Sequence, residues 1–569
     1  MIPMPSNEER MEWWREARFG LFIHWGIYSV PAGEHDGVPV PGYSEWLMKT
    51  AEVPVAQYAK YAKEFTGSKF DAKAIVRLAK AAGMKYIVFT AKHHEGFSLF
   101  ASQVSSFNSV EASPFGRDAV RELAEACASE EMKFGVYYSH SQDWHHQGGA
   151  GNFWDPLQQG DYDAYLEKIA VPQIRELLTQ YGPICCLWYD TPRHITNERA
   201  ELFRPLHSIQ PQLITNDRLH TGHPVTGGKE GDTETPEQYI PVNGIPGKDW
   251  ETCMTLNDSW GFKSGDVRWK SPGTLLRHLS DIVSKGGNFL LNIGPTSEGE
   301  IPEENVKTLE FIGHWMRRNG EAIYGTEASP FTRRLPWGRA TRKSWPSGGS
   351  TIYLHIWNPP ANGKLLLPDL QEIPTKMRLL GENTSPEFRA TDAGLEILLP
   401  CFDTQWIIPI VAVDFSNAAP LIHQKRPSVG EDGRILLVPQ DAELAGDEIE
   451  PPYVSGEAEQ ARITNLNRGS WRVQYSFDTP ADQIWKVTAE VAPCAYNRLI
   501  LSPGGIQDPS TTTTILAWTH GPGDFVAVDF GYFHFPAGMN SLEFRPELPD
   551  LRPLEIRRVW LSPQTPKAD

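Results

Sequence analysis

Residues 1 to about 330 alternate short apolar runs with stretches in which apolar residues recur at helical spacing. The apolar runs predict strands, and the periodic stretches predict helices. Strands are expected at 18–26, 85–94, 133–140, 183–190, 213–218 and 288–295, and helices at 70–84, 117–131, 161–181, 198–210, 273–285 and 303–319. The strands are apolar throughout rather than alternating, which is typical of a parallel sheet buried on both faces.

Alternation of strands and helices over ~300 residues predicts a (β/α)8-like barrel, the TIM fold, for residues 1–330. A doubly wound parallel sheet is the rival prediction. It is weakened because neither a GxGxxG fingerprint nor a phosphate-binding P-loop follows the first predicted strand.

The helical period disappears after residue 330, so the chain is predicted to be multidomain, with C-terminal β-sandwich domains after the barrel. Strand patterns predict one β-sandwich at 331–416 and a second at 435–569, joined by a polar linker at 417–434 that is rich in turn formers. The second sandwich is compatible with a carbohydrate-binding module, because it contains Trp471, Trp485, Trp518 and Trp560. A plain core role for these tryptophans is favoured, since each falls within or beside an apolar strand.

Charge and composition disfavour some classes of binding partner. The formal net charge is −18, from 53 Lys and Arg against 71 Asp and Glu, which disfavours nucleic acid and anionic membranes. No apolar run reaches the ~18 residues of a membrane span. The first residues lack a signal-peptide pattern, so we expect a cytoplasmic protein, or a periplasmic or secreted one if a signal has been removed. The sequence is compatible with an oligomer.

Polar groups beside aromatic residues follow the predicted barrel strands. The strand ends carry His24, the pair His93 and His94, Asp190 and Arg218. In a barrel the carboxyl ends of the strands form the active site, so these groups are expected to converge.

The nature of these groups favours a carbohydrate pocket. Trp188 and Asp190 are two residues apart and therefore point to the same side of their strand. An indole beside a carboxylate suits a sugar ring, with His and Arg donors for its hydroxyls. We expect no catalytic metal and no cofactor, because the pairs His93–His94 and His145–His146 are adjacent and no HxH or HExxH motif occurs.

The amino-acid sequences of these segments and their order along the chain resemble those of glycoside hydrolase family 29, the α-L-fucosidases. The similarity covers nearly all of residues 12–330, and its most specific blocks are FIHWG and TAKHHEGF. Other matching segments are YSEW, YAKEF, FGVYYS, LLTQYGPICCLWYD and SKGGNFLLNIGPTSEGEIP. One position departs from the family pattern, since Glu95 stands where the family often has Asp.

The resemblance implies roles for individual residues. The family's nucleophile falls on Asp190, and the acid/base of one large subfamily falls on Glu237 within DTETPE. Glu230, Glu234 and Glu251 are the alternatives for the acid/base. The family's substrate-binding residues fall on His24, Glu45, Trp46, His93, His94, Tyr137, Trp188 and Arg218.

The expected function is therefore that of a retaining exo-α-L-fucosidase, which removes terminal α-L-fucosyl residues from oligosaccharides or glycoconjugates through a covalent fucosyl-enzyme intermediate. Retention predicts that the two carboxyl groups lie ~5–5.5 Å apart, against ~6.5–9.5 Å for inversion. The alternative is a non-catalytic fucose- or glycan-binding protein on a hydrolase scaffold.

Overall fold

The computed structural model describes residues 5–564 except for a set of gaps. The gaps are 223–229, 242, 246, 333–334, 361, 371, 383, 401–406, 419, 421, 423–425, 446–451, 456–459, 465, 467–470, 494–496, 504–512, 518–524 and 547–553. The chain divides into two compact units. The first comprises Met1–Ile240 and Gly244–Ala328, and the second comprises Pro241–Asn243 and Ser329–Asp569.

The first unit contains a barrel of eight parallel strands in the order β7-β6-β5-β4-β1-β10-β9-β8. The strands are β1 (Phe19–Ile23), β4 (Tyr86–Lys92), β5 (Lys133–Tyr138), β6 (Cys186–Tyr189), β7 (Ile214–Thr215), β8 (Thr233–Glu234), β9 (Asp249–Thr255) and β10 (Asn288–Ile293). A parallel bridge between Asn216 and Thr233 joins the two outer strands and closes the sheet. The predicted barrel is therefore confirmed.

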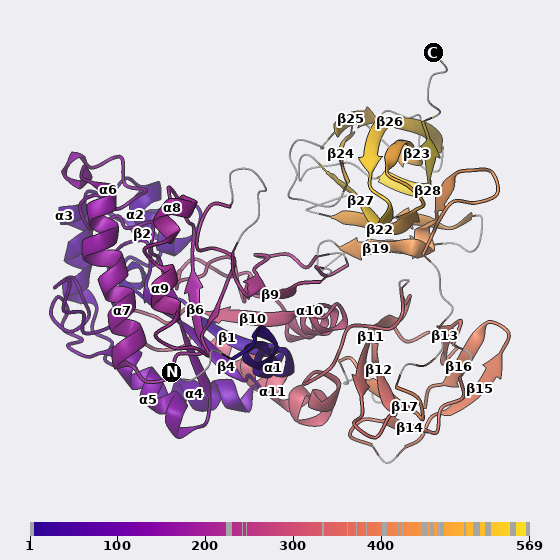
Figure 1. The fold of residues 1–569 in the computed structure, drawn as a ribbon, viewed down its shortest axis with the longest axis horizontal. Coiled ribbons are helices and arrows are strands. Elements are labelled where there is room, and N and C mark those ends of the chain that lie inside the picture. Colours follow the sequence, from indigo (N-terminus) through magenta and orange to yellow (C-terminus); the bar gives the residue numbers. More distant parts are fainter. Residues whose placement is uncertain are drawn as a thin grey trace. The chain divides into compact units, whose positions relative to one another are not determined.

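Helices surround the strands, and Figure 1 shows α4, α5 and α7 outside β1, β4 and β6. The helices of this unit are α1 (Asn7–Ala17), α2 (Leu47–Thr50), α3 (Val55–Tyr58), α4 (Ala72–Ala81), α5 (Ala119–Ser129), α6 (Tyr162–Tyr165), α7 (Val171–Gln180), α8 (Asn197–Ala200), α9 (Arg204–His207), α10 (Pro272–Ser284) and α11 (Glu303–Asn319). Short elements add β2 (Glu34–His35), β3 (Val38–Pro39) and the 3-10 turns Ile27–Ser29, Ser44–Trp46, Ala59–Glu64, Pro156–Gln158 and Gly320–Ala322.

Local sequence explains where the longer helices begin. The carboxylate of Asp71 accepts a hydrogen bond from the backbone of Ala74 and caps α4, and Asp118 caps α5 through Arg121 in the same way. Each helix then turns an apolar face inward, as Ile75 and Val76 do in α4. The barrel is thereby covered on its outside and opens only at the ends of its strands.

Several predicted elements differ from those observed. The expected helix at 198–210 is two short helices, α8 and α9, and Pro205 lies in the first turn of the second. The expected helix at 161–181 contains a π-helical segment at Leu166–Ala170, just before Pro172. Proline lacks the backbone N–H of a regular helix, which explains the changed hydrogen-bond pattern. The helix α1 and the strands β8 and β9 were not predicted.

The first part of the second unit has a four-stranded sheet, β11-β12-β17-β14, and a three-stranded sheet, β13-β16-β15. The strands are β11 (Gly338–Ser344), β12 (Ser350–Ile356), β13 (Lys364–Pro368), β14 (Lys376–Leu379), β15 (Glu387–Thr391), β16 (Gly394–Leu398) and β17 (Ile410–Phe415). Side chains from both sheets, such as Leu354 and Leu367, form one hydrophobic cluster, which makes this a β-sandwich.

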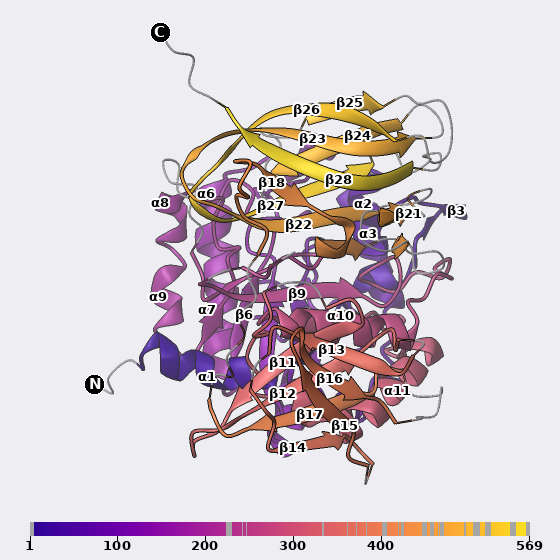
Figure 2. The same cartoon turned by 90° about the vertical axis from the view of Figure 1, so that its right-hand side faces the viewer.

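A second sandwich follows. Its sheets are β20-β21-β28-β23-β26, with β18 beside β28, and β19-β22-β27-β24-β25. The strands are β18 (Ile435–Leu437), β19 (Ala442–Ala445), β20 (Tyr453–Ser455), β21 (Arg462–Thr464), β22 (Arg472–Thr479), β23 (Gln483–Pro493), β24 (Asn497–Pro503), β25 (Thr513–Ala517), β26 (Val526–Phe535), β27 (Gly538–Pro546) and β28 (Leu554–Pro563); Pro439–Asp441 is a 3-10 turn. In Figure 2 the axes of the yellow and orange strands β22, β23 and β28 are nearly aligned, with β23 and β28 antiparallel to each other.

The tryptophans of this second sandwich differ in exposure. Trp471 and Trp485 are buried in its hydrophobic cluster, Trp560 is half-buried, and Trp518 lies outside the described residues. The buried pair fits the core role. The predicted domain limits, the linker at 417–434 and a carbohydrate-binding role stay predictions. Within the described part of the chain, no helix has the length and apolar character needed to cross a membrane.

Candidate active site

A pocket of about 210 Å³ lies at the carboxyl ends of the barrel strands. Nine of the ten predicted site residues line it: His24, Glu45, Trp46, His93, Tyr137, Trp188, Asp190, Arg218 and Glu237. The tenth, His94, reaches the site from the side, with its Nε2 3.4 Å from Asp190 Oδ2. The structure thus brings together residues from seven separate parts of the barrel sequence.

Asp190 follows β6 and accepts hydrogen bonds on both carboxylate oxygens. Tyr137 Oη donates to Oδ2 at 2.8 Å, and Arg218 Nη1 donates to Oδ1 at 2.8 Å, as does the backbone of Thr191. Burial alone would raise the pKa of Asp190, but the hydrogen bond from His94 and the charge of Arg218 hold that pKa well below its usual value. Asp190 is therefore an ionised carboxylate aimed into the pocket.

Arg218 links Asp190 to a second carboxylate. Its Nη1 also donates to Glu237 Oε2 at 2.9 Å, so the two carboxylate oxygens are separated by no more than the sum of 2.8 Å and 2.9 Å. Arg218 is itself fixed by hydrogen bonds to the side chain and carbonyl of Thr235, and it lies 4.6 Å from the ring of Trp188. Glu237 is 39 % exposed, so one carboxylate is enclosed and the other faces the mouth of the pocket.

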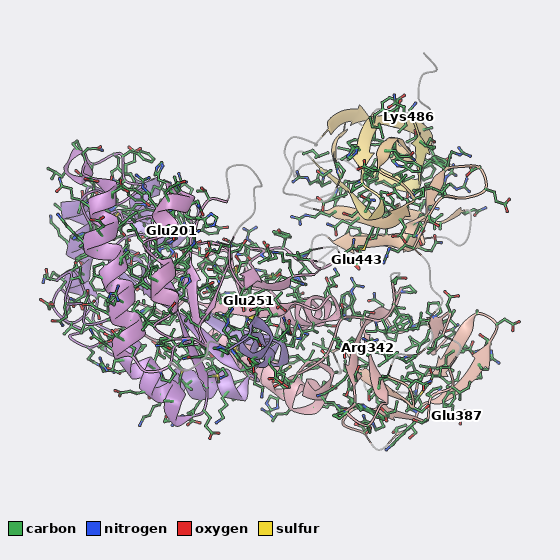
Figure 3. The ribbon with its side chains drawn as sticks, in the orientation of Figure 1. Glu201, Glu251, Arg342, Glu387, Glu443 and Lys486 are labelled. Carbon is green, nitrogen blue, oxygen red and sulfur yellow. The ribbon has the colours of Figure 1, made fainter. Side chains whose placement is uncertain are left out.

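The competing glutamates lie elsewhere. Glu251, labelled in Figure 3, is a β9 residue that accepts a hydrogen bond from Tyr86 and does not line the pocket. Glu230 pairs with Arg204 at 2.7 Å, and Glu234 lies 3.7 Å from Lys248. Glu237 is thus the candidate acid/base that the geometry supports.

His24 offers an acceptor to the pocket. Asn292 donates its amide hydrogen to the carbonyl of Trp260, so its oxygen receives the hydrogen bond from His24 Nδ1 at 2.6 Å. Burial lowers the pKa of His24 to about 4, which keeps the ring neutral and leaves Nε2 unprotonated. A sugar hydroxyl can donate to that nitrogen.

Glu45 supplies a second buried carboxyl group. The backbone of Gly261 donates to its Oε2 at 2.9 Å, while Oε1 has no hydrogen-bond partner within the described residues. Burial raises the pKa of Glu45 to about 7, so the group is protonated in mildly acidic solution and can donate to a hydroxyl.

Glu95 lies below the pocket rather than in it. Its Oε2 is 3.5 Å from His93 Nδ1, and burial raises the pKa of Glu95 to about 8. The departure from the family's usual Asp therefore places a longer, neutral acid behind His93. His94, next in sequence, is held through Nδ1, which lies 2.7 Å from Ser139 Oγ.

Aromatic rings form the pocket's apolar walls. Tyr137 stacks on His93 at 5.4 Å and on Trp188 at 5.6 Å, and Phe22 lies 5.1 Å from Trp188. Five lining residues were missed from sequence: Phe22, Tyr43, Thr191, Cys253 and Trp260. Phe22 had a usable signal, because it lies two positions before His24 on one strand.

His93, His94 and Asp190 also bring potential metal-ligand atoms within 4.8 Å of one another. The Asp190 oxygens already accept hydrogen bonds from Tyr137 and Arg218. The positive charge of the Arg218 guanidinium opposes a second cation beside Asp190. The arrangement is better suited to hydroxyl groups than to a divalent ion.

Comparison with known proteins agrees with this geometry. Residues 4–321 match the family model described as alpha-L-fucosidase. The chain belongs to the alpha-L-fucosidase family. It is therefore a glycoside hydrolase by family, as the sequence resemblance implied.

Individual relatives support the same assignment. Human tissue alpha-L-fucosidase is 32 % identical over 421 residues, covering 70 % of this chain and 85 % of that protein. A putative alpha-L-fucosidase of Caenorhabditis elegans is 32 % identical, covering 57 % and 67 % of the two chains. The crystal structure of an alpha-L-fucosidase from Vibrio sp. strain EJY3 is similar over 98 % of both chains, with 27 % identity and a TM-score of 0.70.

One similar structure captures a reaction step. It is an alpha-L-fucosidase of Bacteroides thetaiotaomicron, described as a trapped covalent intermediate in complex with 2-fluoro-fucosyl fluoride. The likeness covers 73 % of this chain and 97 % of that one, with 26 % identity and a TM-score of 0.64.

Proposed function

We propose that this alpha-L-fucosidase is a retaining exo-enzyme that hydrolyses terminal α-L-fucosyl residues, with Asp190 as nucleophile and Glu237 as acid/base. The observation that carries the proposal is the Arg218 bridge, which keeps the two carboxylate oxygens closer than the ~6.5–9.5 Å of inverting pairs. The trapped covalent intermediate of the Bacteroides relative supports the same chemistry.

In the first step, Asp190 Oδ2 or Oδ1 attacks the anomeric carbon of fucose. The bond from that carbon to the leaving oxygen breaks, and Glu237 gives its proton to that oxygen. In the second step, water attacks the same carbon, Glu237 takes its proton, and the bond to Asp190 breaks. Two displacements at one carbon restore the original configuration.

The remaining groups explain the choice of sugar. A pocket of about 210 Å³ closed by His24, Glu45 and His93 suits one terminal ring rather than an internal one. Aromatic walls at Phe22 and Trp260 suit the methyl group that fucose carries in place of a hydroxymethyl group. A fucose-binding protein without activity would need no paired carboxylates of this kind, so the geometry favours the enzyme.

The test combines labelling with product analysis. Incubation with 2-fluoro-fucosyl fluoride should attach one sugar to the peptide containing Asp190, as read by mass spectrometry, and the Asp190→Asn protein should stay unlabelled. Proton NMR during hydrolysis of an aryl α-L-fucoside should show the α-anomer of fucose first. A label on a different carboxylate, or the β-anomer as first product, would refute the proposal.

A further inference from the structure

A band of aromatic side chains leads from the pocket to the protein surface. Trp46 lines the pocket, and Lys49 Nζ lies 4.7 Å from the centre of a Trp46 ring and 5.7 Å from the centre of the Phe153 ring. Phe153 is 69 % exposed. An exposed phenyl ring thus lies beside the pocket mouth, within reach of whatever is joined to the fucose.

The segment that carries Phe153 is held in place. Phe153 packs edge-on against Trp154 at 5.9 Å, and the Trp154 indole donates to the carbonyl of Val53 at 3.0 Å. The side chain of Asn152 donates to the carbonyl of Trp144 at 2.8 Å. An exposed large aromatic on a fixed support loses little freedom when a ligand binds, and this is a recurrent property of recognition sites.

Two cations accompany the ring. Lys49 is half-buried over the aromatic faces, and burial together with the charge of Arg193 lowers its pKa. Arg193 is exposed, and its backbone donates to the carbonyl of the pocket residue Thr191 at 2.7 Å. Among the described residues, neither side chain has an acidic partner within salt-bridge distance.

The Lys49 and Arg193 pair contrasts with the net negative charge of the chain. The chain has a formal net charge of −18, so acidic side chains are in excess over basic ones. Lys49 lies beside the pocket residue Trp46, and Arg193 is close enough for its charge to act on Lys49, so these two cations without acidic partners attract an anion at their own position. A neutral leaving group would form no ion pair with these two cations.

We propose that Phe153, Lys49 and Arg193 form a leaving-group subsite for an acidic saccharide, one that bears a carboxylate or a sulfate ester. The inference rests on the proposed function, because it concerns what the fucosyl group is attached to. The Phe153 ring contacts the apolar face of the leaving sugar, and the two cations bind its anionic substituent.

The test separates the subsite from the chemistry by varying the leaving group. α-L-fucosyl fluoride has no leaving sugar, a neutral fucosyl trisaccharide has one, and two matched trisaccharides add a carboxylate or a sulfate ester to it. The variants are Phe153→Ala, Lys49→Met and Arg193→Met. Phe311→Ala and Lys307→Met on α11, which alter an exposed Phe and an exposed Lys outside the pocket lining, are the matched controls.

The expected pattern is specific to each residue. Phe153→Ala should lower kcat/KM about tenfold on all three trisaccharides, the size of a typical anchor contact. Lys49→Met and Arg193→Met should each lower kcat/KM about five- to tenfold on the acidic trisaccharides only, and added salt should shrink that difference. The better of the two acidic substrates identifies the anion.

Other results would overturn the subsite. Equal losses on neutral and acidic trisaccharides in Lys49→Met and Arg193→Met would rule out a preference for an acidic saccharide. Unchanged kcat/KM in Phe153→Ala would rule out contact between the Phe153 ring and the leaving sugar. Losses on fucosyl fluoride as large as those on the trisaccharides would show general damage to the active site. Failure of the unaltered protein to hydrolyse fucosyl fluoride would instead count against the proposed function.

Discussion

The barrel has a cavity at each end of its strands, and the two differ in size and in chemistry. The cavity at the amino ends measures about 540 Å³ and is lined by α5, by the start of β5 and by the residues just before β6. The pocket at the carboxyl ends measures about 210 Å³. The larger cavity contains the thiols of Cys127 and Cys185, whose pKa values are raised by burial, so neither is a reactive thiolate.

The charged groups of the two cavities are also used differently. At the amino ends, Arg121 lies over the Tyr181 ring at 4.7 Å and Lys133 over the Trp13 ring at 5.0 Å. At the carboxyl ends, Asp190 and Glu237 share Arg218 and face open space. Convergence of opposite charges, rather than volume, marks the functional end, as expected for parallel barrels.

Loss of Asp190, the proposed nucleophile, should have the largest effect on activity. Asp190→Gly removes the only enclosed carboxylate among the described pocket residues that is held ionised, and kcat should fall by at least ~10⁴-fold, as for other nucleophiles. Azide should partly restore cleavage of an aryl α-L-fucoside by entering the vacated space and displacing the aryl group, which should yield a fucosyl azide of inverted configuration. Activity that persists without azide would rule out this role.

Loss of Glu237, the proposed acid/base, should have the second largest effect. Glu237→Gln should reduce kcat/KM ~10²–10⁴-fold on substrates with a poor leaving group, the usual worth of general acid catalysis. The loss should be far smaller on fucosyl fluoride, whose fluoride leaves without a proton. Glu234→Gln, a change at the nearby alternative, is the control and should behave like the unaltered protein. Equal losses on both substrates would contradict the assignment.

The carboxyl end should also be the more fragile part of the barrel. Lys92 and Asp143 form a fully buried ion pair at 2.6 Å, and Tyr165 Oη is 3.0 Å from the Lys92 amine. Lys92→Met removes the lysine partner of the buried Asp143 carboxylate and leaves it with His146, whose Nδ1 lies 2.9 Å from Asp143 Oδ2, so the free energy of unfolding should fall by up to ~3–5 kcal/mol. Lys133→Met at the exposed start of β5 is the matched control and should change it by less than ~0.5 kcal/mol. Denaturant unfolding measures both, and equal effects would show that the two ends do not differ.

The convergence of the strand-end groups could be predicted from the sequence because their signals are local, whereas Glu45, Trp46 and Glu237 were placed only by the family resemblance. A polar residue directly after an apolar run, as at His24 or Asp190, needs no knowledge of distant contacts. β9 was missed because Glu251, Thr252 and Thr255 interrupt its apolar pattern, and these polar groups are buried only because partners such as Tyr86 lie on other strands. Trp260, in the segment after β9, was missed with it.

The buried acid beside His93 should appear in the pH dependence of stability. The pKa of Glu95 is raised from 4.5 to about 8, so between these values the folded protein holds a proton that the unfolded chain releases. Stability from this group is full below pH 4.5 and is lost as pH rises to about 8. Glu95→Gln should flatten the fall in Tm from pH 5 to pH 8, as followed by calorimetry. Glu298→Gln, at a half-exposed surface pair with Lys69, should leave the slope unchanged.

The smallest expected effect tests the large cavity directly. Ala128 is an exposed α5 residue that lines the cavity at the amino ends, so Ala128→Phe should partly fill it without strain. If that cavity has no part in catalysis, kcat/KM on an aryl α-L-fucoside should stay within about twofold, because such surface changes cost less than ~0.5 kcal/mol. A loss of tenfold or more, with unchanged Tm, would show that the two ends of the barrel are coupled and that volume as well as charge contributes to function.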